Sequence, residues 1–229
     1  MNQKTLQGSV NMLTKNFEEL RVCVAINNIT SDACNISSLA DGEDCMRYMN
    51  SKYGIPEILT GILESFLVKL QPSEAIQFFT SLLDSIACNG KDLTKVSWEF
   101  LASELRNLPK VDSEVQAAIK GMDLLSEGKP WPDACQTSQA ASAASIVSAR
   151  FVCYSNYNYF ANCAAHHSAQ AAIRSSFSYF ASTSAACVAR AAAEANCVAR
   201  AGCDDFYTAY RERQRAILLK FIAEAPTPP

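Results

Sequence analysis

The residues best placed for chemistry are Cys163, His166 and His167, which lie three and four positions apart. On a helix this spacing presents the side chains on one face, as two ligands of a metal site require. A structural zinc site needs two further ligands, and the chain contains no Cys-x-x-Cys pair that would supply them. We therefore interpret these residues as a buried thiol and ordinary helical histidines, and expect no metal.

A catalytic use of the same residues has little support in the sequence. A cysteine nucleophile needs a positioned base, a group that orients the base and an oxyanion site, and no pattern indicates them together. The Gly-Lys steps at Gly90-Lys91 and Gly128-Lys129 lack the flanking glycines of a phosphate-binding loop. The sequence predicts a protein that is not an enzyme and uses no cofactor.

The composition is that of an ordinary globular chain with a lightly charged surface. Of its 229 residues, 49% are hydrophobic and 19% are charged, and the formal net charge is −3. This charge gives no electrostatic reason to expect nucleic acid or an anionic membrane as a partner. No basic segment followed by an apolar run begins the chain, so we expect no secretory signal peptide, a cytoplasmic location and free thiols at the ten cysteines.

The elements that would position these residues are all predicted to be helices. Apolar residues recur at three- and four-residue steps in several segments, and Pro109, Gly128 and Pro130 mark helix ends. Outside residues 54–90 and the Ala-rich segment described below, the predicted helices cover residues 6–26, 44–51, 93–108, 113–126 and 204–223, with a polar loop over residues 27–41.

Residues 54–90 predict a short helical hairpin with an unusually wide apolar face. Pro56 suits the first turn of a helix, Pro72 ends that helix, and Ser73 can cap the next one. The first helix carries two neighbouring apolar rows, which consist of Ile55, Leu59, Leu63 and Leu67 and of Ile58, Ile62, Phe66 and Leu70. Such a hairpin cannot bury its own apolar surface, so it is expected to pair with a copy of itself or with a partner.

The composition changes abruptly at Trp131-Pro132. Residues 134–205 are dominated by Ala and Ser and contain no Pro. Ala is the best helix former, and small residues that recur every four positions over residues 185–203 let helix backbones approach closely. We expect tightly packed antiparallel helices here, with turns at Ser155-Asn156 and near Ser175 and Ser182.

Basic residues are concentrated in the last predicted helix. They are Arg211, Arg213, Arg215 and Lys220. We interpret them as a solvated helix face, with an acidic partner as the alternative.

The hairpin resembles the dimerisation/docking domain of the regulatory subunits of cAMP-dependent protein kinase, known as the RIIa domain, and its relatives in ciliary and chromatin scaffolds. The match covers about 40 of the 229 residues. Two of its positions, Glu74 and Ala75, depart mildly from the family pattern. It is carried by Tyr48-Met49, Gly54 to Leu59, Phe66-Leu67 and Gln71 to Phe78.

The resemblance implies that two hairpins form an antiparallel X-type four-helix bundle, with a groove that accepts an amphipathic helix of a scaffold protein. The residues that would line this groove are Ile55, Leu59, Leu63 and Leu67. Those that would form the dimer core are Ile62, Phe66, Ile76, Phe79 and Leu83. The alternative is that the hairpin belongs to a monomeric core and packs on its own C-terminal helices.

The segment after Lys129 shows a faint similarity, largely compositional, to alanine-rich helical proteins described as putative bacterial immunity proteins. The sequence thus predicts an all-α protein with a docking hairpin followed by an Ala-rich antiparallel bundle. The predicted divisions are residues 1–42, the hairpin 43–90, connecting helices 91–130, the Ala-rich bundle 131–224 and a tail 225–229.

The predicted function is that of a dimerising adaptor that holds a partner helix inside a larger assembly. Because RIIa-type domains are common in ciliary and flagellar scaffolds, an axonemal complex such as a radial spoke or doublet microtubule is the preferred setting. The alternative is a stoichiometric inhibitor or immunity-type binder built on the Ala-rich bundle.

Overall fold

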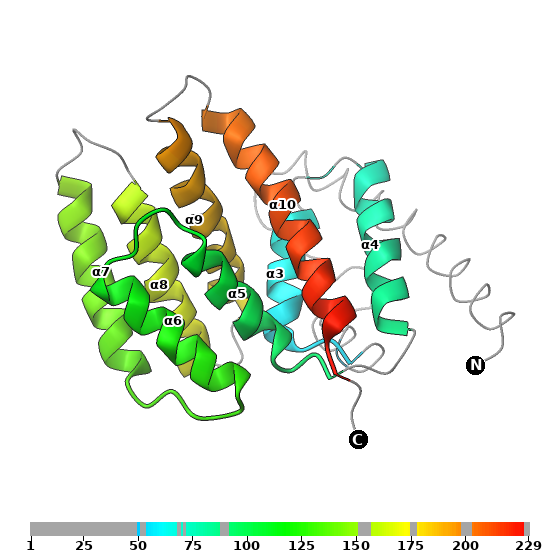
Figure 1. Ribbon diagram of the computed structural model, residues 1–229, viewed down its shortest axis with the longest axis horizontal. Coiled ribbons are helices and arrows are strands. Elements are labelled where there is room, and N and C mark those ends of the chain that lie inside the picture. Colours follow the sequence, from blue (N-terminus) through cyan, green and yellow to red (C-terminus); the bar gives the residue numbers. More distant parts are fainter. Residues whose placement is uncertain are drawn as a thin grey trace, which may run out of the picture.

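The structure is a computed structural model that describes residues 50, 54–67, 70, 72–87, 92–150, 157–174, 178–197 and 203–226. All regular secondary structure in this part of the chain is helical, which confirms the all-α prediction. The helices, labelled as in Figure 1, are α3 (Glu57–Leu67), α4 (Pro72–Ala87), α5 (Val96–Arg106), α6 (Ser113–Ser126), α7 (Ala134–Arg150), α8 (Tyr157–Ile173), α9 (Ser178–Cys197) and α10 (Cys203–Glu224).

Two of the predicted helices lie wholly or largely outside the residues that the structure describes. The one over residues 6–26, and nearly all of the one over residues 44–51, lie outside the described residues. Among the helices that are described, none is both long enough and apolar enough to cross a membrane.

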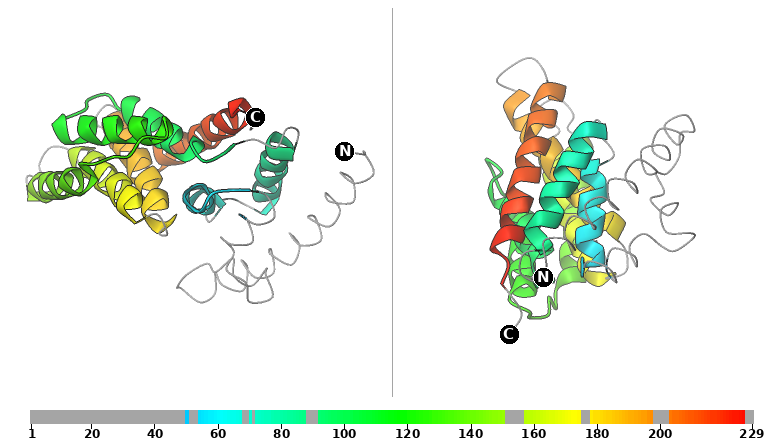
Figure 2. Two further views of the ribbon diagram at one scale, coloured as in Figure 1. Left: turned by 90° about the horizontal axis from the view of Figure 1, so that it is seen from below. Right: turned by 90° about the vertical axis from the view of Figure 1, so that its right-hand side faces the viewer.

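Helix α9 occupies the centre of the molecule. It packs against α8, and α8 packs in turn against α7, so these three helices lie side by side (Figure 1). On its other sides α9 contacts α3, α10 and α5. Figure 2 shows α5, α6 and α10 lying over a layer that contains α7, α8 and α3, with α4 beside α10. The predicted hairpin and the Ala-rich helices are therefore packed together.

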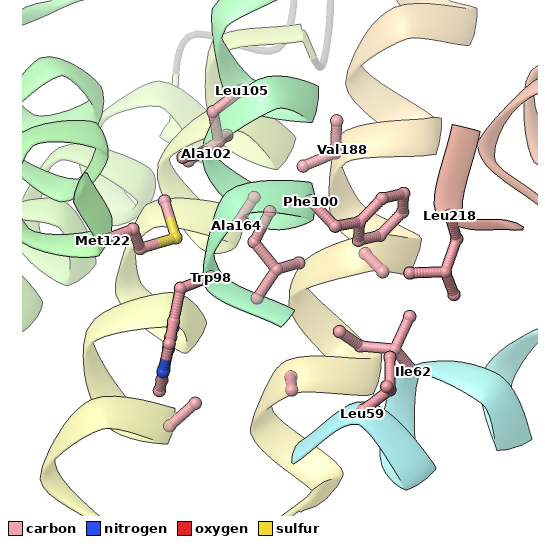
Figure 3. Close-up of a cluster of buried hydrophobic side chains, with 14 of the residues drawn as sticks. Leu59, Ile62, Trp98, Phe100, Ala102, Leu105, Met122, Ala164, Val188 and Leu218 are labelled. Carbon is pink, nitrogen blue, oxygen red and sulfur yellow. The ribbon is translucent and has the colours of Figure 1, made fainter. Parts of the chain in front are cut away.

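One hydrophobic core joins these helices. Phe100 of α5 has no exposed surface, and it lies close to Val188 of α9 and Leu218 of α10, with Leu59 and Ile62 of α3 below it (Figure 3). The same cluster continues through buried residues of α6 and α8. Buried residues of the predicted hairpin and of the Ala-rich helices thus belong to one hydrophobic cluster in the described part of the chain.

Helix α6 begins and ends at the predicted residues because both of its ends are fixed by local signals. The Asp112 carboxylate accepts a hydrogen bond from the backbone N–H of Val115 at 3.0 Å, so Asp112 is the N-cap. At the other end Gly128 adopts a φ of +77° and donates its N–H to Leu125 O, while Lys129 donates to Leu124 O. This pair of bonds is a Schellman motif, which requires the left-handed conformation that glycine adopts without strain.

The small residues of the predicted stripes are buried where α9 is described, but one of the predicted turns of the Ala-rich segment is wrong. Ala185 and Ala189 have no exposed surface, and the hydroxyls of Ser168 and Ser184 hydrogen-bond to each other at 2.8 Å between α8 and α9. Ser182 lies inside α9 rather than in a turn. Its hydroxyl donates to the Tyr179 carbonyl within the helix, so this serine does not compete with helix formation.

Gly121 is required by the close approach of α6 to Trp131. A Cβ atom at position 121 would lie 1.9 Å from Cε2 of the buried Trp131 ring. In an ordinary helix interior, Gly→Ala stabilises by about 0.5–1 kcal/mol. We expect the opposite sign for Gly121→Ala, a loss of about 1–3 kcal/mol from overpacking, measured by urea unfolding.

The exposed neighbour Lys120 provides the control for this prediction. Lys120→Ala should change the free energy of unfolding by no more than about 0.5 kcal/mol. A Gly121→Ala protein that is as stable as the natural chain would show that Trp131 does not pack on α6 in solution.

Candidate functional site

The residues predicted to line a docking groove lie in the core of this chain. Ile55 and Leu59 have no exposed surface and Leu63 is 2% exposed, because α3 packs mainly on α9 and also touches α5. The side chain of Leu67 lies outside the described residues. In this packing the three described side chains offer no open groove, which is the arrangement that the monomeric alternative predicts. A docking role for them would require α3 to leave α9, and it stays a prediction.

The residues predicted to form a dimer core are placed in the same way. Ile62 is fully buried, and the Phe66 ring meets the rings of Phe78 and Phe100 edge to face, with centroids 6.1 and 6.2 Å away. The side chains of Ile76, Phe79 and Leu83 lie outside the described residues. Phe78 belongs to α4 and Phe100 to α5, so the ring contacts of Phe66 are made with other helices of the same chain.

The interpretation of Arg211 as part of a solvated basic face is wrong. Arg211 is only 5% exposed, and its guanidinium carbon lies 4.3 Å from the centroid of the Phe66 ring. Its Nη2 donates to the carbonyl oxygen of Ser65 at 2.5 Å and to the Ser65 hydroxyl at 2.9 Å. Its Nη1 donates to Gln214 Oε1 at 2.9 Å. The planar guanidinium thereby joins α10 to α3, which a solvated side chain could not do.

Arg211 belongs to a buried polar layer between α5 and α10. Burial raises the pKa of Glu104, which has no exposed surface, although Gln214 and the nearby arginines oppose this shift. Burial also raises the pKa of Tyr210, and the charge of Glu104 adds to that effect. These groups have the perturbed acid–base properties of a catalytic site. Their enclosure between packed helices favours a structural role, because Glu104 offers no surface to a substrate.

The residues that first suggested chemistry point in different directions. His166 Nδ1 lies 2.9 Å from both the hydroxyl and the carbonyl oxygen of Ser138 on α7. His167 stacks on Phe180 of α9 with ring centroids 5.9 Å apart. Burial lowers the pKa of His167 to about 4, so this ring is neutral at neutral pH. Across the described part of the chain, no group of three or more His, Cys, Asp or Glu side chains is arranged to hold a metal ion.

Cys163 makes a different set of contacts from the two histidines. Its sulfur lies near the Cys187 thiol of α9 and near the hydroxyl of Tyr159. The neighbouring Cys187 thiol is the main group that lowers the pKa of Cys163, and Cys163 in turn raises the pKa of Cys187. The two thiols therefore form one interacting pair across the α8–α9 interface.

The outer surface of α7 is the most unusual exposed surface of the described residues. No charged side chain occurs between Ala134 and Ala149, and Ile146 and Val147 are each 54% exposed. The exposed side chains occupy one face of the helix, called the α7 face below. It consists of Cys135, Gln136, Gln139, Ala140, Ala143, Ile146, Val147 and Ala149.

No protein-family model, curated protein or solved structure matches this chain. The fold defines the class of the protein as an all-α helical bundle, and any functional conclusion rests on the surfaces of that bundle.

Sequence reasoning did not identify the α7 face or the thiol pair. The α7 face could have been found from the absence of charge over residues 134–149, because an amphipathic surface helix normally carries charges on its outer side. The pairing of Cys163 with Cys187 depends on the register of two helices, which residue spacing within one helix does not give.

Proposed function

We propose that this protein is a non-enzymatic binding module that holds a helix of a partner protein against the α7 face. The observation that carries the proposal is the uncharged, half-apolar surface of α7, with Ile146 and Val147 both more than half exposed. Loss of charge is the compositional feature that distinguishes the centre of a protein interface from the remaining surface. This corresponds to the binder built on the Ala-rich bundle, the second function expected from the sequence.

The spacing of the exposed residues favours a helix as the occupant. Gln136, Ala140, Ala143 and Val147 follow one another at steps of four, three and four residues. This is the spacing of the contact row of a coiled coil, in which side chains of one helix fit between those of another. The small side chains at positions 140 and 143 would let the partner backbone approach closely, as Ala and Ser side chains do between α8 and α9.

The occupant should present an uncharged face of its own. A charged side chain set against the centre of the α7 face would lose its water and find no ionic partner there. We therefore expect a helix rich in small and aliphatic residues, held in a one-to-one complex.

The test begins with photo-crosslinking in native cells. A photoreactive amino acid is placed at Ala143, in the α7 face, and in a second protein at Ala216, an exposed position of α10. We expect one partner that crosslinks from position 143 and not from position 216. The purified partner is then titrated against Ala143→Arg, which should weaken binding by about 100-fold or more, since a charge at the centre of an interface must be desolvated.

Ala216→Arg is the matched control, because it adds the same side chain at another exposed helical alanine. It should leave the affinity for the partner within about twofold of the natural value. The proposal fails if Ala143→Arg binds as tightly as Ala216→Arg. It also fails if position 143 crosslinks only to a second copy of this chain.

The docking adaptor predicted from the sequence is the second candidate function. The local geometry before α3 favours it, because Pro56 directly precedes the first helical residue, in keeping with the Ile-Pro helix start of the RIIa-type pattern. A dimer in light scattering whose crosslinks join α3 or α4 of two copies would support this candidate. A monomer would contradict it, and the ciliary or flagellar setting belongs to this candidate alone.

A further inference from the structure

The two thiols of Cys163 and Cys187 face each other because of the register between α8 and α9. The Ser184 hydroxyl contacts the Ser168 hydroxyl at 2.8 Å and donates to the Ala164 carbonyl at 3.0 Å. In an antiparallel pair, these contacts set residues before Ser168 opposite residues after Ser184. Position 163 is thereby level with position 187, in agreement with the effect of each thiol on the pKa of the other.

The side chains at this interface are small enough for the two sulfurs to be bonded. Ala164, Ser168, Ser184 and Ala191 are all fully buried or nearly so. A disulfide needs Cα atoms about 4.4–6.8 Å apart, which only closely packed helices allow. Both cysteines are free and partly accessible, so a small reagent can reach the pair.

The surroundings of Cys163 favour the reactive form of its thiol. The neighbouring Cys187 and Tyr159 side chains lower the pKa of the Cys163 thiol and so favour its thiolate. The thiolate is the nucleophilic form of cysteine. Cys187, with its proton retained, is placed as the second thiol that resolves an oxidised Cys163.

We propose that Cys163 and Cys187 form a site of reversible oxidation, at which a hydroperoxide converts the two thiols into a disulfide that joins α8 to α9. In the first step the Cys163 sulfur attacks the peroxide, an S–O bond forms, the O–O bond breaks, and hydroxide or alkoxide leaves with the electron pair. Sulfur is oxidised to a sulfenic acid and the peroxide is reduced. In the second step the Cys187 sulfur attacks, the S–S bond forms, the S–O bond breaks, and hydroxide leaves with the thiol proton as water.

The test treats the purified full-length chain with hydrogen peroxide, blocks the remaining thiols and digests it with trypsin. Cleavage at Arg150, Arg174 and Arg190 places Cys163 in peptide 151–174 and Cys187 in peptide 175–190. We expect these two peptides to be joined by a bond that dithiothreitol cleaves. The disulfide should also raise the midpoint of thermal unfolding by roughly 5 °C, because it closes a loop in the unfolded chain.

Single cysteine variants separate the two roles. In Cys187→Ser, Cys163 should remain as the sulfenic acid and react with dimedone, with the label in peptide 151–174. In Cys163→Ser, Cys187 should stay reduced. Because Cys153 shares a peptide with Cys163, the Cys153→Ser variant should still form the crosslink.

Cys135 provides the comparison for simple exposure, because it is an exposed free thiol on α7 without a thiol partner among the described residues. The proposal is overturned if Cys135 oxidises faster than Cys163. It is also overturned if peptides 151–174 and 175–190 stay unlinked while other thiols are oxidised, or if Cys153→Ser removes the crosslink. Failure of partner binding at the α7 face would leave this result unchanged.

Discussion

Replacement of Leu63 by aspartate should unfold the chain. Leu63 is 2% exposed and belongs to α3, which packs on α9. Burying a carboxylate among apolar side chains leaves it without water or a partner, and the packing of the leucine is lost as well. We expect a loss of more than about 4 kcal/mol, measured by urea unfolding and by the helical circular dichroism signal.

Val147→Asp is the control for this prediction, since Val147 is 54% exposed on α7. It should change the free energy of unfolding by about 0.5 kcal/mol or less. If Leu63→Asp instead keeps the helical signal and the unfolding midpoint, α3 is not held on α9 in solution. The exposed docking groove implied by the RIIa resemblance would then be the better interpretation of Leu63.

Removal of the Arg211 side chain should be the other strongly destabilising change. Arg211→Ala deletes the hydrogen bonds to Ser65 and Gln214 and the contact with the Phe66 ring. It leaves the Ser65 carbonyl oxygen without this donor and opens a cavity between α3 and α10. We expect a loss of about 3–5 kcal/mol, read from urea unfolding.

Two further variants show whether this loss comes from the buried guanidinium. Arg211→Lys keeps the charge but cannot reach Ser65 and Gln214 together, so it should recover only part of the stability. Lys220→Ala removes an exposed cation of the same helix, 3.8 Å from Glu224, and should cost about 0.5 kcal/mol or less. Equal losses for Arg211→Ala and Lys220→Ala would mean that Arg211 is solvated after all.

The features that local sequence determines were the ones that could be predicted. Helix α6 has the predicted bounds because Asp112 and Gly128 act on backbone groups a few residues away. The burial of the small residues in α9 likewise follows from their spacing within one helix. Ser182 was assigned wrongly because serine favours turns, whereas here its hydroxyl donates to the Tyr179 carbonyl inside the helix.

The features that depend on distant contacts could not be predicted in this way. Arg211 is buried because it reaches Ser65, which is 146 positions away in the chain. The apolar rows of α3 fit a dimer partner and the chain's own α9 equally well, and only the three-dimensional packing distinguishes these possibilities. The thiol pair has the same origin, since the register of α8 against α9 decides which residue faces Cys163.

The position of α9 has a consequence for synthesis of the protein. Among the described helices α3 leaves the ribosome first, and its main packing partner appears only after α4, α5, α6, α7 and α8 have been made. Such long sequence separation between contacting elements slows folding and leaves apolar surface exposed in the meantime. The nascent chain should consequently depend on a holding chaperone until α9 leaves the exit tunnel, and fragments that end before α9 should aggregate.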